Sequence, residues 1–285
     1  MPFSKDLLIG SSGNQGSAAF YEHQIEQSLR FDADNSGTSS RLYRTYGTVR
    51  DQTKFTFSMW VRRSKTYYNT ANQSWNMLMS TGTGVEGGGA AFGFESGGGT
   101  SGGLSNRDRI AWYGHRGSTG GSATGDDRIA GFYRDTTGWY NIVIRNDTSQ
   151  TSGNRVKYYV NGEGPLTRTT ENNPAGNFDR FHYATNVLNI GGGSTGNYGF
   201  DGLMAEVVYN DGQSYGPENY GETKNGVWIP KDPSGLTFGN QGFYLKFQDT
   251  SNFGDDSSGN NNDFTVANIG TDHQVIESPT IGTGS

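Results

Sequence analysis

The chain has 285 residues, 45 glycines, no cysteine and a formal net charge of −6 at pH 7. Without cysteine it has no disulfide framework and no cysteine-ligated metal site, and its acidic charge argues against a nucleic-acid surface, which needs a basic patch. It contains no run of about 18 apolar residues and no N-terminal apolar stretch of signal-peptide length, so we expect a protein that is made in a cytoplasm and stays soluble.

The composition favours a single all-β domain. Aromatic residues make up 13% of the chain, and short aromatic and β-branched segments alternate with turns rich in Gly, Asn and Ser, as in sandwiches and barrels. All-β domains of this length are often single units. The hydrophobic content of 31% is low, which fits strands with one wet face and long polar loops.

Residues 1–26 precede the first expected core strand and form an N-terminal arm. Leu7, Leu8 and Ile9 are its strongly apolar cluster. They are expected either to add an edge strand to their own domain or to dock on a neighbouring subunit, and the sequence leaves both open. A chain end is poorly ordered unless it packs on the domain or on a neighbouring subunit. We expect the arm to pack in this way and so to anchor the protein.

Strands are expected at residues 28–32 (SLRFD) and 55–61 (FTFSMWV). The most glycine-rich part follows at residues 82–125, where short strands at 91–94 and 109–113 interrupt the glycines. Large loops at one end of a sandwich often carry binding function. The alternative is that these loops are tolerated insertions.

Residues 138–165 predict a β-hairpin. Aromatic and β-branched side chains recur at every second position: Tyr140, Ile142, Ile144, and then Val156, Tyr158 and Val160. This alternation places one set of side chains on each face of a sheet. Residues 147–154 between the two runs are mostly turn formers, and Asn161 with Gly162 predicts a type I′ turn after the second run.

The last third of the chain predicts three more strands and a tail. Strands are expected at 188–191, from 201 to an end at residues 210–213, and at 243–247, and a short helical turn at 217–221. Four apolar side chains of the second strand are expected to share one face: Leu203, Ala205, Val207 and Tyr209. The domain is expected to span residues 27–266, followed by a polar C-terminal tail at 267–285.

These segments resemble, in order, the strands of laminin-G-like, concanavalin A-like domains. The resemblance covers about residues 28–266 and rests on the hairpin together with four further strands: 28–32, 55–61, 188–191 and 200–207. No single motif decides it, but five in the expected order are specific. The resemblance implies an antiparallel β-sandwich of jelly-roll type.

A narrower resemblance lies nearer the ends of the chain. Residues 4–16, 221–231, 243–247 and 256–264 are similar to a group of laminin-G-like proteins encoded by bacteriophages, especially marine ones. The resemblance implies a virion component that is made in the host cytoplasm. Its implied partners are other virion proteins or copies of itself as a homo-oligomer, and a host cell-surface glycan.

Catalytic patterns are missing from the sequence. Glycoside hydrolysis needs two carboxylates about 5 to 10 Å apart, and the Glu-x-Asp-x-x-Glu pattern that concanavalin A-like hydrolases often carry does not occur. Glu206 is expected to lie alone on its strand, flanked by Met204 and Val208. A serine triad is also unsupported, because the four histidines lie in unrelated contexts: His23, His115, His182 and His273. We therefore expect a protein without enzymatic activity.

Aromatic side chains in or beside the long loops are the candidate ligand-binding residues. They are Tyr67, Tyr68, Trp75, Trp112 and Tyr113. A sugar site uses such rings as a platform, and protein interfaces use the same residue types. The sequence does not choose between the two.

Calcium is the one ion that the sequence suggests, and no other cofactor is expected. Calcium prefers oxygen ligands, which Asp255, Asp256, Asn260 and Asp263 offer within one short stretch. The alternative is that Asp and Asn gather here because they favour turns. The stretch also lacks the EF-hand spacing with its closing Glu.

The sequence therefore predicts a structural or adhesive component of a phage particle, such as a fibre or decoration protein, whose loops contact the host surface. The rival hypothesis is a soluble carbohydrate-binding, lectin-like module. A glycan depolymerase would need a carboxylate pair that the sequence does not offer.

Overall fold

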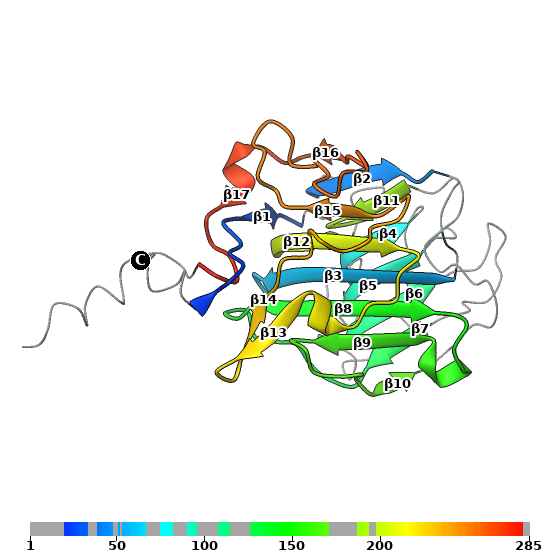
Figure 1. Cartoon of the computed structure of the whole chain (residues 1–285). Coiled ribbons are helices and arrows are strands. Elements are labelled where there is room, and N and C mark those ends of the chain that lie inside the picture. Colours follow the sequence, from blue (N-terminus) through cyan, green and yellow to red (C-terminus); the bar gives the residue numbers. More distant parts are fainter. Residues whose placement is uncertain are drawn as a thin grey trace, which may run out of the picture.

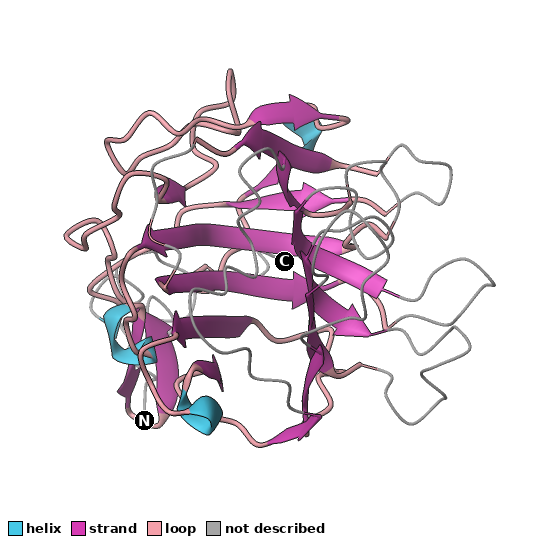
Figure 2. Ribbon diagram, turned by 90° about the vertical axis from the view of Figure 1, so that its right-hand side faces the viewer, coloured by secondary structure: helices cyan, strands magenta, loops and turns pink. Residues whose placement is uncertain are grey.

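The computed structural model describes residues 20–33, 39–47, 51, 53–66, 75–81, 90–95, 108–114, 126–170, 187–193 and 198–281. Two antiparallel sheets lie face to face, sheet A in front of sheet B in Figure 1. Strands and loops dominate the fold, and the helices are short turns (Figure 2). The prediction of an all-β antiparallel sandwich is therefore confirmed.

Sheet A has seven strands within the described ranges. Their order is β17 (Gln274–Val275), β1 (Ser28–Phe31), β12 (Gly202–Asp211), β3 (Lys54–Arg63), β8 (Tyr140–Asp147) and β9 (Val156–Val160), with β15 (Phe243–Leu245) also paired to β12. A separate hairpin of β13 (Gly221–Lys224) and β14 (Val227–Pro230) lies beside it. Short 3-10 turns lie at Ser152–Asn154, Pro217–Asn219 and Thr271–His273, the second of them at the predicted helical turn.

Sheet B has eight strands in the part of the chain that is described. Their order is β10 (Arg168–Thr170), β7 (Asp126–Ile129), β6 (Ile110–Gly114), β5 (Ala90–Glu95), β4 (Trp75–Thr81), β11 (Val187–Ile190), β2 (Arg41–Thr45) and β16 (Thr265–Ala267). None of the helices in the described ranges has the length and apolar character that a membrane crossing requires.

The main core lies between the two sheets and follows the period-two pattern. Alternate residues of β3, such as Phe57 and Met59, are fully buried in it, as is Ile144 of β8. Aromatic rings fill much of the space, and Phe57 stacks on Tyr209 with ring centroids 4.4 Å apart. Each such side chain contributes about 1.5 to 3 kcal/mol by leaving water.

The predicted hairpin forms from β8 and β9, and the predicted turn follows β9. Ile142 lies opposite Val160, and Val160 exchanges two backbone hydrogen bonds with Glu163, of 3.1 and 3.0 Å. Asn161 and Gly162 between them have φ values of 50° and 77°. Positive φ at both central residues defines the type I′ turn that Asn-Gly predicts.

Strand β12 departs from the predicted alternation. Its pairing with β3 shifts between Ala205 and Val208, and Glu206 at the shift has a φ of 46°. This β-bulge adds one residue, so Val207 faces the main core while Ala205 and Val208 belong to clusters on the outer face of sheet A. The expected shared face of β12 was therefore wrong. Because of the bulge, the Glu206 carboxylate points away from the apolar core.

Both ends of the described chain meet on sheet A. Strand β17, from the predicted polar tail, pairs with β1 and puts Val275 opposite Ser28. Ser28 Oγ also donates a 2.6 Å hydrogen bond to the carbonyl oxygen of Glu277. The described part of the tail is thus joined to the sheet. Leu7, Leu8 and Ile9, the predicted anchoring cluster, lie outside the described residues.

Candidate functional site

Trp112, one of the predicted ligand-binding aromatics, is a core residue. It lies on β6, whose Ile110 and Trp112 face the space between the sheets while Ala111 faces outward. The indole is fully buried and stacks on Phe55 with centroids 5.8 Å apart. Strand alternation therefore turns this ring inward, and its prediction as an exposed platform was wrong.

Trp75 is also buried, with 6% of its surface exposed. It opens β4 and packs with Met77, Ala91 and Ala111 on the outer face of sheet B, so its ring is not an exposed platform either. Tyr67 and Tyr68, and the side chain of Tyr113, lie outside the described residues, and for them ligand binding stays a prediction.

Asp256, a predicted calcium ligand, has both carboxylate oxygens occupied by hydrogen-bond donors. Oδ1 accepts from the backbone N–H groups of Tyr244 and Ser258, and Oδ2 accepts from Ser258 Oγ and the Asn262 N–H, all at 2.8 to 2.9 Å. Asp263 Oδ1 in turn accepts from the Asp256 N–H at 2.9 Å. A carboxylate that accepts four such bonds has little lone-pair capacity left for a cation.

The other predicted calcium ligands also serve the turn. The Asn260 amide donates to the carbonyl oxygens of Gly239 and Gly242 at 2.7 and 3.0 Å. Asp255 is largely exposed. The small part of its carboxyl group that is buried, together with the nearby negative charges of Asp263, Asp249 and Asp256, raises its pKa. Across the described residues, no three acidic or histidine side chains converge as a metal site requires. These contacts favour the turn interpretation over calcium.

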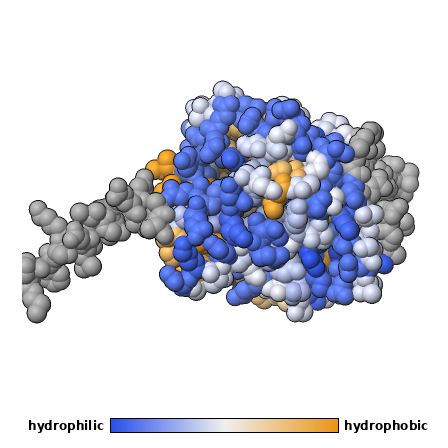
Figure 3. Space-filling view, viewed as in Figure 1, coloured by the Kyte–Doolittle hydropathy of each residue, from blue (hydrophilic) through white to orange (hydrophobic). Residues whose placement is uncertain are grey.

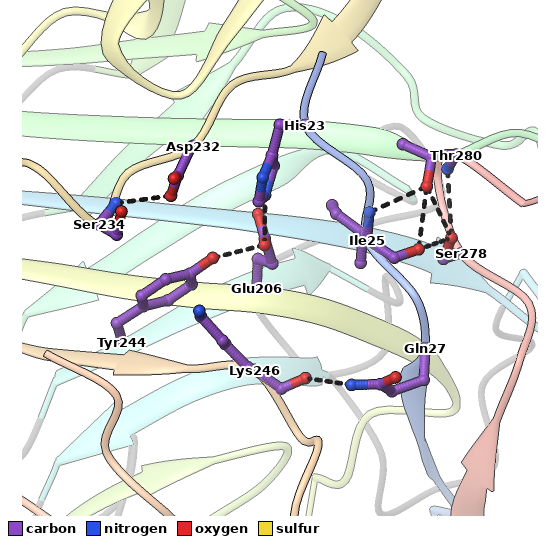
Figure 4. Close-up of polar contacts among 10 residues, drawn as sticks. All are labelled: His23, Ile25, Gln27, Glu206, Asp232, Ser234, Tyr244, Lys246, Ser278 and Thr280. Carbon is purple, nitrogen blue, oxygen red and sulfur yellow. Dashed lines mark hydrogen bonds and ion pairs between the residues drawn. The ribbon is translucent and has the colours of Figure 1, made fainter. Parts of the chain in front are cut away.

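A polar cluster gathers instead around Glu206 at the β12 bulge (Figure 4). Glu206 is 6% exposed, and its Oε1 accepts a 2.5 Å hydrogen bond from the Tyr244 hydroxyl of β15. The same oxygen lies 2.7 Å from Nε2 of His23, which arrives on the N-terminal segment. A positive φ at a non-glycine residue costs about 1 to 3 kcal/mol and is concentrated at functional sites.

The cluster shifts the pKa values of its members. Burial alone would lower the pKa of His23, but the hydrogen bond and charge of Glu206, with the charge of Asp232, raise it overall. Burial and the neighbouring Glu206 charge raise the pKa of Tyr244 far above its usual value. Tyr244 is therefore a neutral hydrogen-bond donor, and the raised pKa of His23 favours its charged form beside Glu206.

The space beside this cluster is small. A cavity of about 110 Å³ lies between the N-terminal segment and the sheet, bordered by His23, Glu206, Lys246 and the side chains of Gln24, Gln27 and Gln248, among others. Ligand sites usually measure 300 to 1,000 Å³. The Glu206 cluster thus suits a contact between chain segments better than a ligand site.

A larger groove opens elsewhere on the outer face of sheet A, and we call it the sheet A groove. Its volume is about 460 Å³, and it is lined by Arg30, Arg62, Arg63, Ser64, Thr136, Thr137, Leu203, Val275 and Glu277. Figure 3 shows that the surface on this side of the molecule is mostly hydrophilic.

Two charged side chains lie together in the sheet A groove. Arg62 forms an ion pair with Glu277 and donates from Nε to the carbonyl oxygen of Thr136 at 3.1 Å. Arg63, next along β3, points the opposite way and is buried, where Asp108 Oδ1 lies 2.9 Å from its Nη1. Alternation along β3 thus turns the Arg62 side chain toward Glu277 and the Arg63 side chain toward Asp108 in the interior.

The sequence predicted neither the Glu206 cluster nor the Arg62–Glu277 pair in the sheet A groove. Glu206 was expected to stand alone, yet it holds partners 38 and 183 residues away in the chain. A single acid within the apolar run of β12 was the one signal. No sequence pattern indicated that Glu277, in the predicted tail, would pair with Arg62.

No protein-family model matches the chain, and a search of curated protein sequences finds no match. Among solved structures, the fold is similar to a putative carbohydrate-binding protein from Bacteroides ovatus, at 17% identity and a TM-score of 0.41, over 74% of this chain and 57% of that one.

Two further solved structures are similar. Tailspike protein 2 of an Escherichia coli O157:H7 bacteriophage matches at 14% identity and a TM-score of 0.42, over 68% of this chain and 23% of that one. A heptameric SAP-like pentraxin from Limulus polyphemus matches at 12% identity and a TM-score of 0.40, over 66% and 77%. Such distant likenesses concern the β-sandwich alone, and the assignment of the fold rests on the two sheets themselves.

Proposed function

We propose that the chain is a non-enzymatic adhesion module that binds a carbohydrate in the sheet A groove and is carried on the surface of a bacteriophage particle. The observation that carries the proposal is the groove itself. Its volume of about 460 Å³ lies within the usual range of small-molecule sites, and its lining combines charged, hydroxyl and apolar groups.

The lining suits a sugar because its charged and hydroxyl groups can pair with the hydroxyl groups of a sugar, and its apolar groups can contact the C–H face of the ring. The carboxylate of Glu277 accepts hydrogen bonds and the guanidinium of Arg62 donates them, so the pair matches hydroxyl groups that do both. Thr137 is exposed and its hydroxyl donates to Asp135 Oδ1 at 2.7 Å, which leaves its oxygen free to accept a bond. Leu203 and Val275 supply apolar surface for the C–H face of a ring. Ligand pockets combine apolar lining with a small number of placed polar groups.

The absence of catalysis is part of the proposal. Hydrolysis of a glycosidic bond needs two carboxylates with separate roles. Glu277 is the one carboxylate in the described lining of the groove, and it is paired with Arg62. Cleavage of a polysaccharide that is lost on changing one Asp or Glu would overturn this part.

The virion assignment is supported by the sequence resemblance to phage-encoded laminin-G-like proteins. The proposed partners are other virion proteins or further copies of the chain, assembled after synthesis in the host cytoplasm. Mass spectrometry of gradient-purified particles tests this assignment. A chain that is absent from particles but binds glycans would be the lectin-like module of the rival hypothesis.

Binding is tested on a glycan array, followed by calorimetry with the strongest hit. Thr137→Trp fills the groove from its exposed rim, and Glu277→Gln keeps the shape while removing the charge. We expect both variants to lose binding. Glu163→Gln, which removes an exposed carboxylate on the hairpin turn, is the matched control and should bind as the wild type does. Undiminished binding by Thr137→Trp would exclude the sheet A groove as the site.

A further inference from the structure

Residues 20–27 lie on the outer face of sheet A, where two anchors hold them, together with a 3.4 Å hydrogen bond from Gln27 Nε2 to the Lys246 carbonyl oxygen and a contact of Lys224 with the Phe20 ring. Ile25 packs its side chain with Trp60 and Ala205. Its backbone N–H donates to Thr280 Oγ1 at 2.9 Å, and its carbonyl oxygen accepts from the hydroxyls of Thr280 and Ser278. Together these contacts of Ile25 form a first anchor for the segment. It consists of apolar packing and hydrogen bonds to hydroxyl groups, so it contains no group that titrates.

The second anchor is ionisable. His23 Nε2 lies 2.7 Å from Glu206 Oε1, and the two side chains are 17% and 7% exposed. The other ion pair of the segment joins Glu22 to Lys224 of β13 at 3.7 Å, and the Glu22 side chain is 83% exposed. Water screens that outer pair, so the charged hold on the segment comes mainly from His23 and Glu206.

We propose that the His23–Glu206 pair is a protonation-controlled latch, which holds residues 20–27 on sheet A while His23 is charged and loosens them when His23 loses its proton. The geometry supplies a single oxygen that serves two donors (Figure 4). Tyr244 stays neutral and keeps its own bond to that oxygen, so the change of charge falls on His23.

Charged groups from every neighbouring element act on His23. Glu206 of β12 and Asp232, which follows β14, favour the charged imidazole, whereas Lys246, just after β15, opposes it. Glu22 and Glu26 flank His23 on its own segment. The net effect is a raised pKa. Loss of the proton can leave the hydrogen bond from Nε2–H to the Glu206 carboxylate in place, and what it removes is the attraction between two opposite charges.

The direction of the pH effect follows from the raised pKa. A histidine whose pKa is higher in the folded state stabilises that state most fully below its unfolded value of about 6.5. The contribution is lost as the pH rises through the folded value. The latch is therefore closed in mildly acidic solution and weakens in alkaline solution. The base of the predicted N-terminal arm thus has two states of attachment.

Hydrogen–deuterium exchange of the full-length chain at pH 6 and pH 9, corrected for intrinsic exchange rates, tests the latch. In the wild type we expect protection of the peptide that contains residues 20–27 to fall about fivefold between the two pH values, because the charge–charge attraction between His23 and Glu206 is lost with the proton. In His23→Gln, which cannot be charged, protection should be low and equal at both. His273→Gln is the matched control, because His273 contacts Asp32 and Asp272 instead, and it should keep the wild-type response.

A second measurement keeps the test independent of folding defects in a variant. An NMR titration of wild-type protein should give a pKa for His23 above 6.5, and Glu206→Gln should lower it. Wild-type protection that does not change with pH would overturn the latch. So would a His23→Gln variant that keeps the wild-type pH response, or a His23 pKa at or below 6.5.

Discussion

The two faces of sheet A are built in different ways. The inner face takes alternate side chains from its own strands and packs them, mostly through apolar contacts, against sheet B. The outer face carries charged groups such as Glu206 and Arg62, which have partners on segments outside the sheet's central strands. Local alternation thus determines the inner face, whereas the outer face depends on where distant segments come to lie.

The difference extends to what each face can do. Apolar packing dominates the inner face and stabilises the fold, and polar side chains there are buried in fixed pairs, such as the Tyr158 hydroxyl that donates to Asp127 Oδ2 at 2.7 Å. On the outer face Glu206 and Arg62 are paired with His23 and Glu277, and both of these partners belong to peripheral segments, residues 20–27 and the stretch after β17. Their pairing therefore depends on how those two segments are held on the sheet.

The largest effect is expected from truncating the inner face. Phe57→Ala should lower the free energy of unfolding by about 3 to 5 kcal/mol, because Phe57 is fully buried and stacks on Tyr209. Denaturant titration measures the loss. Val227→Ala, which truncates an apolar residue that is 50% exposed, is the control and should change stability by less than about 0.5 kcal/mol. A comparable loss in both variants would mean that the inner face is not the main source of stability.

This inner face is also the part that the sequence predicts well. The expected strand at 55–61 is β3, which carries Phe57 in the core, and the alternation of Tyr140, Ile142 and Ile144 is that of β8, whose Ile142 and Ile144 face the core. Asn161-Gly162 forms the expected turn. Such features depend on neighbours in the sequence. Trp112 shows the limit, because its place beside glycine-rich loops suggested exposure, while alternation within β6 turned it inward.

The outer face could not be predicted in the same way. The bulge at Glu206 is one inserted residue in a strand that reads as regular, and it moves the carboxylate from the core to the outer face. Its partner His23 lies 183 residues away. No local pattern encodes a contact that depends on the path of the whole chain, and the pairing of Arg62 with Glu277 is of the same kind.

An intermediate effect is expected at the bulge. Glu206→Ala should lower the free energy of unfolding by about 1 to 3 kcal/mol, because it leaves the buried Tyr244 hydroxyl without its acceptor. Tyr244→Phe in the same background should recover part of the loss. A double-mutant cycle measures the coupling, for which we expect about 0.5 to 3 kcal/mol. Strictly additive losses would show that the short Tyr244–Glu206 bond contributes nothing.

A smaller, pH-dependent effect is expected from His23. The difference in unfolding free energy between the wild type and His23→Gln should be about 1 kcal/mol in favour of the wild type near pH 6. It should shrink as the pH rises through the raised pKa of His23, since the folded state then loses the charge that stabilised it. Denaturant titrations at several pH values measure this difference. A difference that grows with pH would mean that burial, which lowers the pKa, outweighs Glu206.

The smallest effect is expected where an ion pair lies on the outer face but in water. Glu22→Gln breaks the pair with Lys224, whose atoms are 3.7 Å apart, yet it should change the free energy of unfolding by less than about 0.5 kcal/mol, because solvent screens exposed charges. Denaturant titration in low and high salt measures it. If Glu22→Gln cost as much as His23→Gln, burial would not be what distinguishes the two pairs. The hold on residues 20–27 would then be spread along the segment instead of being concentrated at His23.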